Sequence, residues 1–259
     1  MARGILLRAR GSIVSSGRVV ALRHIKGTCD FAEPRHAVGP ACARSSWPTR
    51  AAVSWAEIRG AFMIKLLIFI NVAVFGAELI AGDALLRAFA LWPLGISGEG
   101  MRSGFMPWQP LTYAFLHANG AHLALNMFGL YMFGRDVERA VGAPRTWLLY
   151  LSSILSAAFA QIAFTVLSVF SAGPVIGASG GVFGLLLAYA VLFPNRMIVP
   201  LIPPIPMPAW VFATLYAIVE LTLGVSGTEV DVAHFAHLGG MAGSGVLLWH
   251  WLRGTPRES

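Results

Sequence analysis

A serine between glycines is the first feature of this sequence that could carry chemistry. Residues 177–181 read Gly-Ala-Ser-Gly-Gly and begin an apolar stretch. A serine hydroxyl is a good nucleophile only when a base takes its proton. Glycines let a substrate backbone approach, and the free N–H groups of a helix N-terminus favour an oxyanion. Ser179 is therefore a candidate nucleophile. The spacing of Gly180, Gly184 and Ala188 equally predicts a helix-packing surface, and both roles can coexist.

The candidate base is His237, which lies in a second glycine-rich stretch. Glycines at positions 239, 240 and 243 give this segment a thin helical face. That face could pack closely against the glycines of the Ser179 helix. Such packing would bring the imidazole within hydrogen-bond distance of the hydroxyl, as a general base requires. The alternative interpretation of His237 is a structural hydrogen bond between helices.

Two further polar residues could stabilise an oxyanion. His122 and Asn126 are four residues apart and therefore lie on one face of a helix. Both can donate hydrogen bonds, His122 through a ring N–H and Asn126 through its amide. His117 is five residues before His122, so it points elsewhere and is interpreted as a structural loop contact.

The acidic residues are not predicted to complete a catalytic triad. Glu220 is the one carboxylate deep in an apolar stretch, and a hydrogen bond that fixes its helix explains it as well as a catalytic role does. Asp136 and Glu138 lie between Arg135 and Arg139, and we expect them to pair with these arginines at a membrane interface.

Two other chemistries are excluded by context. The pattern Gly-x-Ser-x-Gly at 177–181 resembles the nucleophile elbow of α/β-hydrolases, but that motif requires a preceding strand and a soluble sheet. No His-Glu-x-x-His motif occurs, and His234 and His237, three residues apart, would need metal ligands from elsewhere. We therefore expect no metal and no cofactor.

The elements that position these residues are apolar helices. The chain is 56% hydrophobic and only 12% charged, too few charges for a water-soluble surface. Six stretches are long and apolar enough to span a bilayer, and prolines separate most of them. The predicted spans are 63–82, 114–134, 146–170, 177–194, 207–225 and 232–253. The mixed linker 83–111 is interpreted as a half-buried segment along the interface.

The order of the spans brings the polar residues to one level. Most loop Lys and Arg residues fall on one side if both termini are cytoplasmic, which is the expected orientation. Spans two, four and six then all begin at the outer surface. The candidate polar residues lie near these three starts: His122, Asn126, Ser179, His234 and His237. This convergence of a hydroxyl, imidazoles and a carboxamide in one layer indicates a functional site.

The basic N-terminus is a separate region. Residues 1–60 contain ten Lys or Arg and three Asp or Glu, which accounts for the net charge of +7, whereas the remainder is neutral. We expect a disordered extension at 1–61 (or an artefact of the start site), a membrane domain at 62–254 and a short tail at 255–259. The balanced charge of the apolar part argues against nucleic-acid binding. Both cysteines lie in the extension, so disulfides do not hold the fold together.

Together these motifs resemble one family. His122-x-x-x-Asn126, then Gly177-Ala178-Ser179-Gly180, then Ala236-His237-x-x-Gly240 is similar to the pattern of rhomboid proteases. The resemblance covers about 190 residues, from near 63 to near 253, and implies an all-α, polytopic six-transmembrane-helix bundle. Where the family often carries Arg after a Trp, this chain has Gln109.

The resemblance implies an intramembrane serine endopeptidase with a Ser179–His237 dyad. The oxyanion hole would consist of His122, Asn126 and the N–H of Ser179. Other residues implied to line the site are Gly177, Ala178, Gly180, Phe183 and His234. Phe183 would stack on His237, and the region of span five with the loop 226–231 would act as gate and cap.

The resemblance further implies substrates that are membrane proteins with a transmembrane helix. The expected location is a bacterial inner membrane, with the site open to the outer side; a mitochondrial inner membrane is the alternative. The oligomeric state is not predicted. Two other functions stay open, an inactive rhomboid-like protein that binds membrane clients and a transporter or proton pathway.

Overall fold

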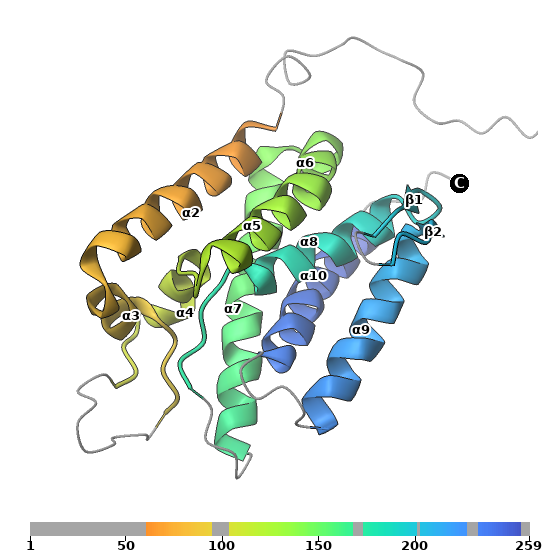
Figure 1. Ribbon diagram of the computed structural model, residues 1–259. Coiled ribbons are helices and arrows are strands. Elements are labelled where there is room, and N and C mark those ends of the chain that lie inside the picture. The colour runs from red at the N-terminus through yellow and green to blue at the C-terminus, as the bar shows by residue number, and fades with distance from the viewer. Residues whose placement is uncertain (1–60, 95–103, 168–172, 201–202, 227–232, 255–259) are drawn as a thin grey trace, which may run out of the picture. The chain divides into compact units, whose positions relative to one another are not determined.

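The chain folds as a set of packed helices in the computed structural model (Figure 1). The structure describes residues 61–94, 104–167, 173–200, 203–226 and 233–254. Its elements are α2 (Phe62–Ala81), α3 (Asp83–Phe89), α4 (Gln109–Thr112), η1 (Tyr113–Phe115), α5 (Gly120–Gly129), η2 (Leu130–Gly134), α6 (Arg135–Val141), α7 (Ala143–Leu167), α8 (Ser179–Leu192), β1 (Met197–Ile198), β2 (Met207–Pro208), α9 (Ala209–Ser226) and α10 (His234–Gly254). The predicted extension, apart from residue 61, the C-terminal tail and most of the cap loop lie outside the described residues.

Three helices, α7, α8 and α10, pack against one another, and α2 and α9 lie on opposite sides of them (Figure 1). The contact between α8 and α10 is made by backbone. A Cβ built on Gly240 would collide with the carbonyl oxygen of Gly180, and one on Gly184 would lie 2.9 Å from the carbonyl oxygen of Gly240. Small residues thus let the two backbones approach closely, as the glycine spacing predicts.

Each predicted apolar stretch contains a helix, but the second begins later than expected. Its helix starts at Gly120 instead of residue 114, because the side chain of Asn119 accepts a hydrogen bond from the His122 N–H (2.8 Å) and caps the helix. The segment from α5 to α6 is continuous and contains the π-helical turn η2. Within the described ranges, α2, α7 and α9 are long and apolar enough to cross a bilayer, and α8 is a shorter apolar helix.

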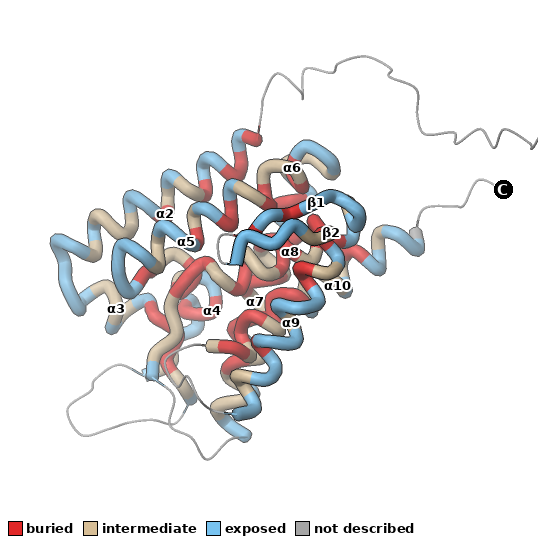
Figure 2. Tube along the Cα trace, turned by 45° about the vertical axis from the view of Figure 1, so that its right-hand side comes forward, coloured by how far each residue is buried: buried red, intermediate tan, exposed pale blue. Residues whose placement is uncertain are grey.

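Apolar side chains cover the outer faces of α2 and α9. Figure 2 shows buried residues where the helices pack against one another and exposed residues on these outer faces. The exposed residues include Phe69, Leu79 and Ile80 of α2, and Trp210 and Ile218 of α9. Exposed apolar surface of this extent is costly in water and is suited to lipid.

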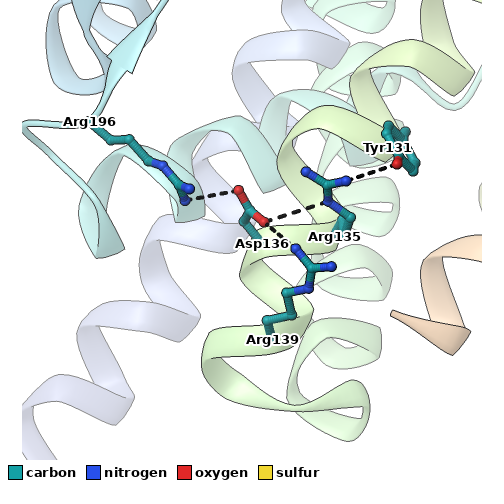
Figure 3. A network of polar contacts seen from close by, with 5 residues as sticks. All are labelled: Tyr131, Arg135, Asp136, Arg139 and Arg196. Atoms are coloured by element: carbon teal, nitrogen blue, oxygen red, sulfur yellow. Dashed lines mark hydrogen bonds and ion pairs between the residues drawn. The ribbon is translucent and has the colours of Figure 1, made fainter. Parts of the chain in front are cut away.

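Charged residues at the far end of the α5–α6 segment form a network around Asp136 (Figure 3). Its carboxylate lies 3.6 Å from the Arg135 guanidinium, 3.2 Å from Arg139 and 2.9 Å from Arg196. Arg135 also donates a hydrogen bond to the hydroxyl of Tyr131 (2.8 Å). The expected pairing of Asp136 with Arg135 and Arg139 is therefore confirmed, and Arg196 joins it.

Glu138 does not take the expected place in this network. Its side chain is buried, and its two oxygens accept hydrogen bonds from the N–H groups of Met63 and Ile64, each 2.9 Å long. These N–H groups belong to the first turn of α2 and have no partner within that helix. Glu138 therefore caps α2 from another part of the chain, a role that spacing within α6 could not reveal.

Replacement of Glu138 by alanine is expected to destabilise the fold by about 2–3 kcal/mol, because two buried N–H groups lose a charged acceptor. The measurement is thermal unfolding of the purified protein in detergent. Arg139→Ala is the matched control on the same helix, since its half-exposed ion pair contributes less than about 1 kcal/mol. Equal melting temperatures for the two variants would contradict the capping role.

Candidate active site

Ser179 is the first residue of α8, and the segment before it is fixed by backbone hydrogen bonds. Val175 and Leu91 exchange two bonds of 3.0 and 2.9 Å, and the N–H of Gly177 donates to the carbonyl of Tyr113 (2.9 Å). Gly177 has a φ of +122°, a conformation that side chains disfavour. These contacts hold the hydroxyl at the helix N-terminus, the position expected from the sequence.

The hydroxyl of Ser179 meets the imidazole of His237. Their Oγ and Nε2 atoms are 2.8 Å apart, so the predicted proximity is confirmed. The close backbone contact of α8 with α10 makes this approach possible. The ring of Phe183 stacks on the imidazole, with centroids 4.3 Å apart and planes 10° apart, as expected. This stacking restricts the orientation of the ring.

Two potential hydrogen-bond donors lie near this pair. Nδ1 of His122 accepts a hydrogen bond from the N–H of Ala118 (3.4 Å), which leaves Nε2 to carry the proton. The His122 ring lies against the α-carbon of Gly177, where a Cβ would be 2.9 Å from Nε2. The amide of Asn126 donates one N–H to the carbonyl of His122 (2.9 Å) and retains a second.

These side chains line a cavity of about 700 Å³. The polar and aromatic residues in its wall include His122, Asn126, Gln161, Ser179, Phe183 and His237. A cavity of this size suits a peptide segment or a small organic group. Gln161 of α7 was not predicted, although a carboxamide inside an apolar stretch was a signal for it.

Four residues predicted to line the site are not part of the cavity wall. Gly177, Ala178 and Gly180 are buried next to Ser179 in the chain, and Gly177 supports the His122 ring from behind the wall. His234 is buried against Glu220.

His117 is buried outside the cavity wall. Its backbone N–H donates a hydrogen bond to the carboxylate of Glu78 (3.1 Å), which fits the structural role predicted for this residue.

Glu220 corrects a further prediction, that no acidic residue is placed to complete a triad. Its Oε2 atom lies 2.9 Å from Nδ1 of His237 and 2.6 Å from Nδ1 of His234. The sequence shows where along α9 Glu220 lies. It does not show which neighbouring helix the side chain faces, because the rotation of one apolar helix against another depends on packing.

Comparison with known proteins assigns the chain to a family. The family model described as "Rhomboid domain" matches residues 104–254, more than half of the chain. The chain belongs to the rhomboid family. Rhomboid membership and the apolar helices together make it an integral membrane protein with a helical membrane domain.

Rhomboid relatives occur in bacteria and in mitochondria. The chain is 31% identical to "Rhomboid protein 1, mitochondrial" of Saccharomyces cerevisiae over 146 residues, which are 56% of this chain and 42% of the yeast protein. It is 32% identical to "Rhomboid protease GluP" of Bacillus subtilis over 138 residues, 52% of this chain and 24% of GluP. With "Rhomboid protease AarA" of Providencia stuartii the identity is 26% over 204 residues, 70% and 69% of the two chains.

The aligned region thus spans less than half of the yeast protein and about a quarter of GluP. The rhomboid domain is what these proteins share with this chain. The bacterial inner membrane stays a prediction, with the mitochondrial one as its alternative, because relatives of both kinds match.

Proposed function

We propose that this rhomboid protein is an intramembrane serine endopeptidase in which Ser179 is the nucleophile and His237 the general base. The observation that carries the proposal is the 2.8 Å contact between Ser179 Oγ and His237 Nε2 in a cavity that also holds two hydrogen-bond donors. A nucleophile within hydrogen-bond distance of a base is the minimal arrangement for acyl transfer. The relatives named as rhomboid proteases support this reaction class.

The reaction follows from these positions. Ser179 Oγ attacks the carbonyl carbon of the scissile peptide bond while His237 Nε2 takes the hydroxyl proton. The tetrahedral intermediate collapses when His237 returns that proton to the leaving amine, which forms an acyl-enzyme on Ser179. Water then attacks the ester, again with His237 as base, and releases the second product.

The negative oxygen of the intermediate requires donors. His122 Nε2, Asn126 Nδ2 and the backbone N–H of Ser179 are the proposed oxyanion hole. The first N–H groups of a helix have no intrahelical acceptor, so that of Ser179 is free to donate, and the helix dipole favours an anion there.

The proposed substrates are membrane proteins cut in or near a transmembrane helix. Six spans with both termini cytoplasmic would place the cavity a short way below the outer surface. The cavity wall includes apolar side chains such as Phe128, Met132 and Phe212, which suit an apolar substrate segment. A transporter would need polar residues at several depths, and an inactive client-binding protein would not need both Ser179 and His237. The peptidase is therefore preferred.

Cleavage by the purified protein in liposomes tests this function. A single-span peptide with small residues near one end should be cut into two fragments. A soluble peptide with the same cleavage sequence but no apolar segment should be cut at a much lower rate, because it does not partition into the bilayer. Absence of cleavage, or equal rates for both peptides, would contradict an intramembrane endopeptidase.

Asn126→Ala is expected to lower kcat by about 100- to 1000-fold, the usual effect of removing one oxyanion donor. KM should change little, because the donor acts on charge that develops in the transition state. Steady-state kinetics on the single-span peptide measure both constants. Asn71→Ala is the matched comparison, because the Asn71 amide makes the same bond to the carbonyl four residues earlier, that of Leu67 on α2, and does not line the cavity. A kcat for Asn126→Ala within threefold of wild type would exclude it from the oxyanion hole.

A further inference from the structure

Glu220 brings a buried carboxylate to the back of the candidate catalytic imidazole. It belongs to α9, whereas His234 and His237 belong to α10. All three side chains are buried, and one oxygen of Glu220 lies 2.6 Å from Nδ1 of His234 and 2.9 Å from Nδ1 of His237. Burial of a carboxylate costs desolvation free energy unless the charge is paired or hydrogen-bonded, here with the two imidazoles.

The direction of this contact matters for catalysis. Nε2 of His237 faces Ser179, so Nδ1 is the nitrogen on the opposite side of the ring, and Glu220 lies there. When the imidazole takes the Ser179 proton it becomes positively charged. A carboxylate 2.9 Å away stabilises that charge, and the interaction is strong where water is excluded.

The two contacts of Glu220 differ in quality. The contact with His234 is aligned as a hydrogen bond, whereas that with His237 is close but not aligned. His234 therefore holds the carboxylate, and His237 interacts with it mainly through charge. Gly224, one turn after Glu220, lies against the Cβ of His234 and the ring of Phe235, which keeps α9 against α10 at this level.

We propose that Glu220 is a positioning residue that orients His237 and stabilises its protonated form, with His234 holding the carboxylate in place. This inference rests on the proposed peptidase function and adds a third member to the Ser179–His237 pair. Because the acid and the base are on different helices, the arrangement is complete only while α9 is packed on α10 here.

A purely structural role is the first competing explanation. If Glu220 only pinned α9 through His234, loss of either partner would have the same effect. That effect would appear in KM, because α9 belongs to the region expected to gate substrate entry, or in the melting temperature. A role toward His237 predicts instead that Glu220 matters more than His234 and that kcat changes while KM does not.

A metal is the second competing explanation. Glu220, His234 and His237 are of the residue types that bind Zn²⁺, and their ligand atoms lie within 4.8 Å of one another. Their separations of 2.6 and 2.9 Å are hydrogen-bond distances, and two ligands on a tetrahedral zinc are further apart. We therefore prefer the metal-free arrangement.

The test measures kcat and KM on the single-span peptide for the wild type, Glu220→Gln, Glu220→Asp and His234→Asn. Glu220→Gln keeps the shape but removes the charge, and its kcat should fall about 10- to 100-fold with KM within threefold of wild type. Glu220→Asp keeps the charge and should recover part of the loss. His234→Asn should lose less than Glu220→Gln because the carboxylate remains. Melting temperatures in detergent check that each variant folds.

A kcat for Glu220→Gln within twofold of wild type would overturn the proposal. So would equal losses in Glu220→Gln and His234→Asn, or a change confined to KM or to the melting temperature. Wild-type activity should survive removal of metal by EDTA. A loss that added Zn²⁺ restores would also overturn it, in favour of a metal site. A wild-type protein that neither cleaves nor reacts at Ser179 would refute the peptidase function instead.

Discussion

Replacement of Ser179 by alanine should reduce cleavage of a single-span substrate by at least about 10⁴-fold. The variant loses the only atom of residue 179 that can form the acyl-enzyme, while the cavity and its donors stay in place. His237→Ala should cause a loss of similar size, because the hydroxyl loses its base at 2.8 Å. The double variant should be no slower than either single variant, since the two side chains act as one unit.

Fragment formation on gels, followed over hours, measures this residual rate. Ser179→Ala should insert and melt like the wild type, because the change removes one oxygen at the edge of a cavity. Ser152→Ala is a matched control: its hydroxyl donates to the carbonyl of Leu149 on α7 and faces no base. Cleavage by Ser179→Ala at more than about a hundredth of the wild-type rate would refute the nucleophile assignment.

Gly240→Ala should lower kcat by about 100-fold without any change to a reacting atom. Its new Cβ would collide with the carbonyl oxygen of Gly180 and lie 2.8 Å from the carbonyl carbon, so the backbones of α8 and α10 must separate. Ser179 and His237 lie within one turn of this contact. A displacement of about 1 Å between reacting groups is enough for such a loss. The melting temperature should fall as well.

Gly76→Ala is the control for this prediction. Gly76 is also a helical glycine, but no atom lies within 4 Å of the position that its Cβ would take. Alanine there should leave cleavage unchanged and stabilise α2 slightly. Normal activity in Gly240→Ala would show that the backbone contact does not set the distance between the hydroxyl and the imidazole.

Much of the site could be predicted from the sequence because the relevant signals are strong and local. Apolar stretches located the helices, and glycine spacing predicted the close packing of α8 and α10 that brings Ser179 to His237. The pair His122 and Asn126 followed from a four-residue spacing. In an apolar helix a polar residue is costly, so each one pointed to a role.

The remaining features depend on contacts between elements far apart in sequence. Glu220 was placed at the correct level, but no periodicity says which neighbour a buried carboxylate faces. Glu138 was assigned to nearby arginines, yet it caps α2, whose first N–H groups are 74 and 75 positions away. Gln161 reaches the cavity through the packing of α7. Membrane orientation and the basic extension stay predictions.

Covalent labelling by a fluorophosphonate tests the central claim most directly, because such reagents report an activated serine without any choice of substrate. The purified wild-type protein is treated with the reagent, digested, and the adduct is located by mass spectrometry. The adduct should lie on Ser179 in the wild type and be absent from the folded His237→Ala variant. A folded wild-type protein with no adduct, an adduct on another serine, or equal labelling of Ser179 without His237 would contradict the proposed pair.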